Sequence, residues 1–128
     1  MTSIFLGLGA ILAAVAVACG AFASHALKDR LTERALEIFE TGTRYQMYHS
    51  LALLLVALLL SQSQAGQSSL IGAGIAFLVG IVLFSGSLYA LALSEIKGLG
   101  AITPLGGVAF LIGWGCLLSA AFAFKSSP

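Results

Sequence analysis

Charged side chains are scarce in this sequence. They make up 9% of the 128 residues, whereas an average soluble domain has about 25%. Hydrophobic residues make up 59%, and the mean hydropathy is +1.05. A soluble domain of this size leaves a large share of its surface in water, so it could not cover so much apolar surface. We therefore expect a protein of the lipid bilayer. The net charge of +1 gives no indication of nucleic-acid binding.

Cysteine is also scarce, and recognisable catalytic motifs are missing. Cys19 and Cys116 lie in separate apolar runs and are interpreted as small buried residues. No phosphate-cradling glycine motif is followed by Lys and Ser or Thr. Ser24, His25 and Asp29 are close only in sequence, and a catalytic triad is defined by its geometry. We predict no catalytic residues, no metal, no cofactor and no enzymatic activity.

A basic segment before the first apolar run is missing too. Residues 1–5 carry no Lys or Arg, and the apolar run over residues 4–23 is longer than the apolar core of a signal peptide. Residues 21–23, Ala-Phe-Ala, resemble a cleavage site. We nevertheless predict that this run is retained as a membrane span.

The sequence contains four apolar runs of membrane-crossing length. They predict an all-α membrane protein with a single domain over residues 1–128, folded as a four-transmembrane-helix bundle. The predicted spans are residues 4–24, 45–62, 70–93 and 101–124. Small residues recur every four positions, a spacing that lets helices pack closely within one protomer or between protomers. These residues are Ala10, Ala14 and Ala18 in the first span and Gly72, Ala76 and Gly80 in the third.

The charge is concentrated between His25 and His49, which enclose eight of the eleven charged side chains. Thr32 is predicted to cap a short amphipathic interfacial helix over residues 32–41, between spans one and two. Gly42 follows this helix and is interpreted as a hinge, a kink or a close contact.

The Lys and Arg residues predict the orientation in the membrane. Five of the six lie in the first and third loops, and the sixth is close to the C-terminus. The positive-inside rule therefore places the charged loop, residues 25–44, in the cytoplasm and both termini on the opposite side.

Polar residues near the ends of the spans form a candidate ligand or partner site. They are His25, Glu40, Arg44, Tyr45, His49, Ser85, Ser87 and Tyr89.

Two pairs within this set have alternative interpretations. His25 and His49 could share a metal with Glu40, but nothing fixes a further ligand, and hydrogen bonding at a wet interface is the simpler interpretation. Glu40 and Arg44 have the spacing of a helical ion pair. Alternatively, Arg44 extends to the membrane surface or binds a lipid phosphate or a carboxylate.

Part of this set could form a polar patch inside the bilayer. Gly42, Tyr45 and His49 share one helical face, which could meet residues 85–89 of the third span. Such a patch could relay protons through His49. Alternatively, its hydrogen bonds simply fix the register between helices.

Several stretches resemble a known family. They are GAFASHAL (20–27), FETGTRYQMYHSLALLL (39–55), LFSGSLYAL (83–91) and LGAITPLGG (99–107), followed by GW at 113–114. Their order and spacing are similar to those of the membrane proteins called domain of unknown function 423, which include transmembrane protein 256. Ser24 stands where a glycine is expected, and both residues are small. The resemblance implies a four-span membrane protein. It implies no established activity and assigns no catalytic residues.

Two functional hypotheses follow. The first is a small structural, interaction or assembly subunit that docks a protein partner, or a second copy of itself, through residues 25–44. The alternative is a channel or transporter that moves a proton, ion or small solute past Arg44, His49 and the patch at residues 85–89. In both hypotheses the spans contact the lipid bilayer.

Overall fold

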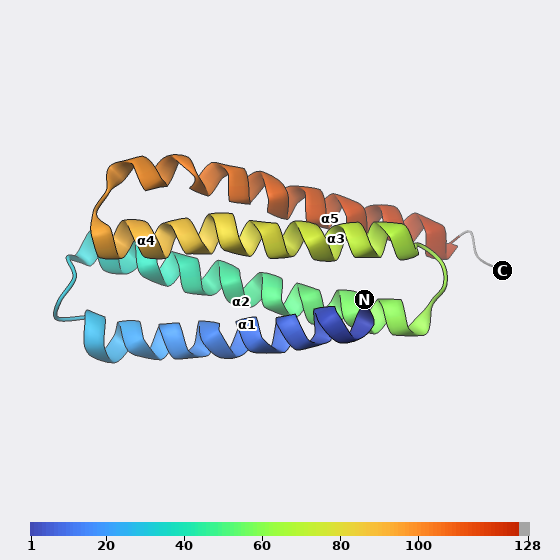
Figure 1. The fold of residues 1–128 in the computed structure, drawn as a ribbon, viewed down its shortest axis with the longest axis horizontal. Coiled ribbons are helices and arrows are strands. Elements are labelled where there is room, and N and C mark those ends of the chain that lie inside the picture. The colour runs from blue at the N-terminus through green and yellow to red at the C-terminus, as the bar shows by residue number, and fades with distance from the viewer. Residues whose placement is uncertain (126–128) are drawn as a thin grey trace.

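Four long helical segments lie along a common axis, and each runs opposite to the one before it (Figure 1). The computed structural model describes residues 1–125, and these residues contain no strand. The predicted four-helix membrane bundle is confirmed. The elements are α1 (Thr2–Phe22), η1 (Ala23–Leu27), α2 (Glu33–Gln62), α3 (Gln67–Gly80), η2 (Ile81–Ser85), α4 (Gly86–Ser94), η3 (Lys97–Ala101) and α5 (Thr103–Lys125). The segments η1 and η2 are single π-helical turns, and η3 is a 3₁₀ turn.

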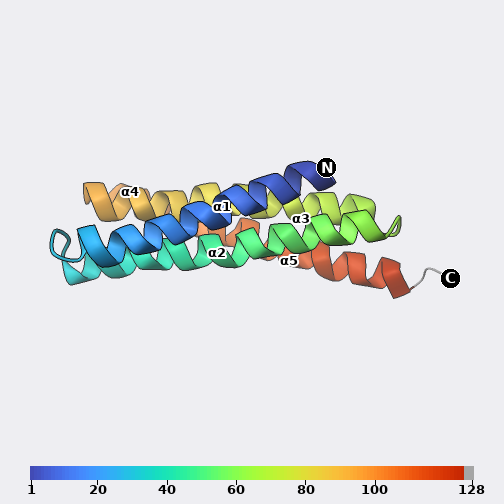
Figure 2. The same ribbon diagram turned by 90° about the horizontal axis from the view of Figure 1, so that it is seen from below.

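Each span is longer than its apolar run predicted. The continuous segments are Thr2–Leu27, Glu33–Gln62, Gln67–Ser94 and Lys97–Lys125. A helix of 26 to 30 residues is about 40 to 45 Å long, whereas the hydrocarbon core is about 30 Å thick. The helix ends therefore reach the headgroup region, and the bundle is elongated in both views (Figure 2).

The helix predicted over residues 32–41 is present, but it is not separate. Its cap is as predicted, because the Thr32 hydroxyl accepts a hydrogen bond of 3.1 Å from the Ala35 amide. The helix then continues without a break to Gln62. Ala35, Phe39, Gly42 and Gln46 are all buried, so the amphipathic stretch and the span share one buried face at helical spacing. Nothing at the junction interrupts the helix.

Gly42 makes a close contact, which is one of its three predicted roles. A Cβ atom at this position would lie 2.8 Å from Cε1 of Tyr89 and 3.4 Å from Cβ of Leu88. The missing side chain therefore lets the Tyr89 ring rest against the α2 backbone. The α-helix is continuous through Gly42.

Aromatic rings seated against glycines join the helices. Phe5 of α1 lies over Gly74 of α3, where an added Cβ would be 2.5 Å from Cε2 of the ring. Phe110 of α5 lies over Gly80 in the same way. The predicted packing face of Ala10, Ala14 and Ala18 is instead exposed. Within this protomer α1 packs through another face. The Phe5 ring is inserted against α3, and Gly9 lets α1 approach α2 closely, since a Cβ at Gly9 would lie 3.1 Å from the Ser50 carbonyl oxygen. The buried residues of α1 are Phe5, Gly9 and Ala16.

The connection that carries Lys28 and Arg30 lies at the same end of the bundle as the connection that precedes Lys97. Residues 28–32 join the first span to α2, and residues 95–96 join α4 to η3, at the left of Figure 1. Met1, the turn at residues 63–66 and the end of α5 lie at the other end. Gly66 closes that turn with φ of +69°, a conformation that favours glycine. We call the end of the bundle that holds residues 28–32 and 95–96 the charged end.

Candidate functional site

A cluster of hydrogen-bonded polar side chains joins three helical segments of the bundle, α1, α2 and the segment formed by η2 and α4. The Gln46 side-chain amide donates to the Leu12 carbonyl at 2.8 Å. Its carbonyl oxygen accepts from the Tyr89 hydroxyl at 2.6 Å. The Ser85 hydroxyl donates to the Gly42 carbonyl at 2.7 Å. Gln46 was missing from the predicted site, although an amide side chain within an apolar helix is itself a signal of an interhelical hydrogen bond.

His49 turns toward α5 rather than toward residues 85–89. Its Nε2 accepts a hydrogen bond of 3.1 Å from Trp114 Nε1, and its Nδ1 lies 2.7 Å from the Tyr45 carbonyl. Because an indole N–H can only donate, Nε2 must be unprotonated and the ring proton must be on Nδ1. The ring stacks on Phe110, with centroids 3.5 Å apart and planes at 7°. His49 is therefore a neutral packing group that joins α2 to α5.

Ser87 and Tyr45, two further residues of the predicted site, also contact neighbouring elements. The Ser87 hydroxyl lies 2.6 Å from the Thr103 hydroxyl at the start of α5. The Tyr45 ring packs against Phe84, with centroids 4.6 Å apart. Every buried side-chain nitrogen or oxygen among residues 1–125 has a hydrogen-bond partner. This pattern favours the interpretation in which hydrogen bonds fix the register between helices.

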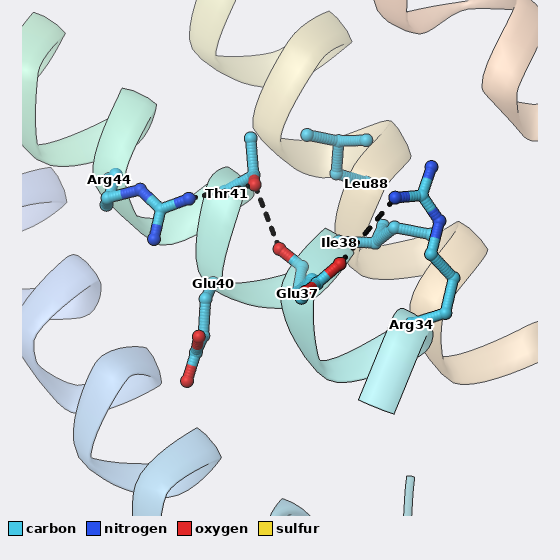
Figure 3. Close-up of a pocket in the computed structure, with 7 residues that line it drawn as sticks. All are labelled: Arg34, Glu37, Ile38, Glu40, Thr41, Arg44 and Leu88. Carbon is cyan, nitrogen blue, oxygen red and sulfur yellow. Dashed lines mark hydrogen bonds and ion pairs between the residues drawn. The ribbon is translucent and has the colours of Figure 1, made fainter. Parts of the chain in front are cut away.

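The expected ion pair between Glu40 and Arg44 is not formed. The Arg44 guanidinium instead donates to the Thr41 hydroxyl at 3.1 Å, and the Glu40 carboxylate points away from it (Figure 3). The Thr41 hydroxyl oxygen lies one helical turn from Arg44 and can accept its hydrogen bond. An exposed ion pair would add little stability, because water hydrates both charges well. Within residues 1–125, the one ion pair joins Arg34 and Glu37 at 3.7 Å.

His25 is exposed on η1, at the end of the first span. His49, by contrast, is buried within α2. Among the described residues, no three His, Cys, Asp or Glu side chains come close enough together to hold a metal ion. The alternative of a metal shared by the two histidines and Glu40 therefore has no ligand set here.

The charged end carries an amphipathic groove between α2 and α4. It consists of two adjoining hollows of about 460 and 390 Å³, which share Arg34 and Ile38. We call it the α2–α4 groove, and Figure 3 shows its first hollow. The first hollow is lined by Arg34, Glu37, Ile38, Glu40, Thr41, Arg44 and Leu88, and the second by Thr32, Arg34, Ala35, Ile38, Leu91, Ala92, Glu95 and Lys97.

A second groove lies deeper, between α2 and α5, and is mostly aromatic. It has a volume of about 410 Å³, and we call it the α2–α5 groove. Its lining residues are Tyr45, Tyr48, His49, Phe84, Gly107, Phe110, Leu111 and Trp114. The sequence gives no sign of this groove, because its two walls are far apart in the chain.

Comparison with known proteins identifies similar membrane proteins. The family described as "Protein of unknown function (DUF423)" matches residues 19–107. The UPF0382 membrane protein YwdK of Bacillus subtilis strain 168 is 47% identical over 121 residues, which cover 94% of this chain and 98% of that protein. A UPF0382 membrane protein of Staphylococcus epidermidis strain ATCC 12228 is also 47% identical, with 94% and 97% covered. No solved structure is significantly similar to the chain.

Proposed function

The chain belongs to the DUF423 family of membrane proteins, and we propose that it is a docking subunit, which holds an amphipathic helix of a membrane-protein partner in the α2–α4 groove. The observation that carries this proposal is the combination of an apolar floor with charged rims at the one end of the bundle where most of the charge is found. It deepens the expectation that residues 25–44 contact a partner.

The floor of the groove suits the apolar face of a helix. Ile38, Leu88 and Leu91 line it, and Ile38 belongs to both hollows. Apolar anchors at helical spacing are how an amphipathic helix binds in a hydrophobic groove. Ile96 lies just beyond, in the connection to η3, and is 60% exposed. It extends the apolar surface that a partner could cover.

The rims carry charge of both signs. Arg34 and Glu37 stand on the α2 side, while Glu95 and Lys97 stand on the opposite side. Exposed charges contribute little to the stability of the fold. At an interface they select the partner and fix its register. Most of the charged residues of the chain are concentrated at one groove. Recognition of a partner therefore explains this concentration better than a contribution to folding does.

The transport alternative receives less support from the same geometry. A conducting path needs polar groups that are free to exchange partners. Both ring nitrogens of His49 are already engaged, by Trp114 and by the Tyr45 carbonyl. The Gln46 amide is likewise held by Leu12 and Tyr89.

The orientation of the charged end belongs to the same proposal. Lys28, Arg30 and Lys97 share one end of the bundle, and the positive-inside rule then places that end in the cytoplasm. An alkaline phosphatase fused after Pro128 should be active in a bacterial host, because the C-terminus would lie outside. An inactive fusion whose full-length product is in the membrane would reverse the orientation.

Docking is tested by site-specific photo-crosslinking in native membranes. A photoreactive residue at Glu37 faces the groove, whereas one at Glu33 lies on the same helix and outside the groove lining. We expect a discrete crosslinked product from position 37 and little from position 33. Mass spectrometry then identifies the partner, or a second copy of this chain. Equal yields from both positions, or no product from either, would contradict docking in this groove.

A further inference from the structure

We propose that the α2–α5 groove binds one acyl chain of an anionic phospholipid, whose phosphate is held by Arg44. Arg44 also lines the first hollow of the α2–α4 groove. The α2–α5 groove itself shares no lining residue with the α2–α4 groove, and this proposal does not depend on a protein partner. The proposal joins three observations: the depth of Arg44, the aromatic lining below it, and the free donors of its guanidinium.

Arg44 lies at the depth of lipid headgroups. It is the last charged residue of α2, and residues 45–62 carry no charge. This uncharged length is about 27 Å at 1.5 Å per residue, close to the hydrocarbon thickness of about 30 Å. With residues 45–62 in the hydrocarbon, the Arg44 guanidinium reaches the phosphate layer.

The α2–α5 groove begins immediately below Arg44. Tyr48 lines it and lies one helical turn after Arg44, on the same face of α2. On the opposite wall, the groove runs along α5 from Gly107 to Trp114, a rise of about 10 Å. Both helices start at the charged end, so the groove leads from the headgroup level toward the middle of the bilayer.

Gly107 lines this groove and faces open space. A Cβ added at Gly107 would meet no atom within 4 Å. Its neighbour Gly106 differs, since a Cβ there would collide with Phe84. Gly107 is therefore not required for close packing between helices, and the space beside it is open. A surface hollow inside a bilayer is filled by lipid chains, and rings such as Tyr48 and Trp114 offer them broad apolar surfaces.

Charge complementarity selects an anionic lipid. Among the described residues, the partner of Arg44 is the Thr41 hydroxyl, which uses one of five N–H donors. The remaining N–H donors of the planar guanidinium match the oxygens of a phosphate group. Glu40 and Glu37 are the nearby acidic side chains of the hollow, and the Glu40 carboxylate points away from the guanidinium (Figure 3). Within residues 1–125, Arg44 thus forms no ion pair, and it lies one helical turn from Tyr48 in the wall of the α2–α5 groove.

The single tryptophan of the chain is a built-in reporter. Trp114 lies in the groove wall, and bromine atoms on an acyl chain quench indole fluorescence on contact. We would prepare the protein in phosphatidylcholine vesicles with a small fixed fraction of phosphatidylglycerol. In one set the bromines are on the phosphatidylglycerol chains, and in the other on an equal amount of phosphatidylcholine. The bulk composition is the same, so the ratio of quenching reports the lipid preference at the groove.

We expect the wild type to prefer phosphatidylglycerol about fivefold, the factor that one basic residue near an anionic surface contributes. Arg44→Gln should bring the ratio close to one. Gly107→Leu should reduce quenching by both lipids, because the leucine fills the groove. Gly7→Leu is the matched control, since a Cβ at Gly7 also meets no atom within 4 Å, and it should behave like the wild type. Helical circular dichroism and Trp114 emission in unbrominated vesicles confirm that each variant is folded.

Three results would overturn the proposal. One is equal quenching by the two brominated lipids in the wild type. Another is a ratio that Arg44→Gln leaves unchanged. The third is quenching that Gly107→Leu and Gly7→Leu reduce to the same extent. Excess inorganic phosphate should leave the wild-type ratio unchanged, and a ratio abolished by phosphate would assign Arg44 to a free anion instead of a lipid.

Discussion

Adding one methyl group to each of two adjacent glycines should have opposite effects on stability. Gly106 and Gly107 both lie in the first turns of α5. A Cβ at Gly106 would lie 2.6 Å from Cβ of Phe84 and 2.7 Å from its Cα, and would also collide with its backbone nitrogen. The atoms in the way belong largely to the backbone of η2, so a side-chain rotation cannot relieve the collision. A Cβ at Gly107 would meet no atom within 4 Å.

The magnitudes follow from these distances. Overpacking costs about 1 to 3 kcal/mol, and more where backbone must move. Replacing glycine by alanine inside a helix returns up to about 1 kcal/mol. Gly106→Ala should therefore destabilise the bundle by about 1 to 3 kcal/mol even after the helix gain. Gly107→Ala should leave stability unchanged or raise it by up to about 1 kcal/mol.

The assay is equilibrium unfolding in mixed micelles, with increasing sodium dodecyl sulfate and with helical circular dichroism and Trp114 emission as probes. The difference between the two variants, about 1 to 4 kcal/mol, is the prediction. It does not depend on the absolute stability, because both variants have the same composition. Equal midpoints for Gly106→Ala and Gly107→Ala would refute the reasoning, since the contact of α5 with η2 would then not be as close as described.

The same assay checks three further predictions. Tyr89→Phe removes the donor to the Gln46 carbonyl oxygen, and a buried acceptor left without its partner should cost about 1 to 3 kcal/mol; an unchanged midpoint would show that water replaces the hydroxyl. Thr32→Ala removes the cap of α2 and should cost about 1 kcal/mol, so a loss below the error of the titration would count against a fixed helix start. Arg34→Gln breaks the ion pair with Glu37, yet it should move stability by less than about 0.5 kcal/mol, because both side chains are mostly exposed; a large loss would mean that this pair is buried in an assembly.

Hydropathy predicted the four spans, but it could not predict where the helices end. The apolar run of the second span begins near Tyr45, whereas α2 begins at Glu33. Charged residues at the headgroup level lower the hydropathy without interrupting helical hydrogen bonds. A buried face at helical spacing continues from Ala35 through Phe39 to Gly42, and it was visible in the sequence. This continuous buried face correctly indicates one long helix. The change from charged to apolar residues wrongly suggested two separate helices.

The polar contacts were predicted only in part. Gly42, Ser85 and Tyr89 come together as expected, because their helices are adjacent in the bundle. His49 was expected beside them and instead binds Trp114. Which neighbour a buried side chain meets depends on the rotation of each helix about its axis, and a single sequence does not specify that rotation. For the same reason, the contrast between Gly106 and Gly107 appears only in the structure.

The central claim is that polar groups inside the spans hold the fold together, while the α2–α4 groove at the charged end contacts a partner. The most direct test measures the photo-crosslink from position 37 in two backgrounds. Ile38→Gln makes the groove floor polar. Tyr89→Phe removes the hydrogen bond to the Gln46 side chain inside the bundle. We predict that the crosslinked product is lost with Ile38→Gln and kept with Tyr89→Phe at equal protein levels. A product that survives Ile38→Gln, or disappears with Tyr89→Phe alone, would contradict the claim.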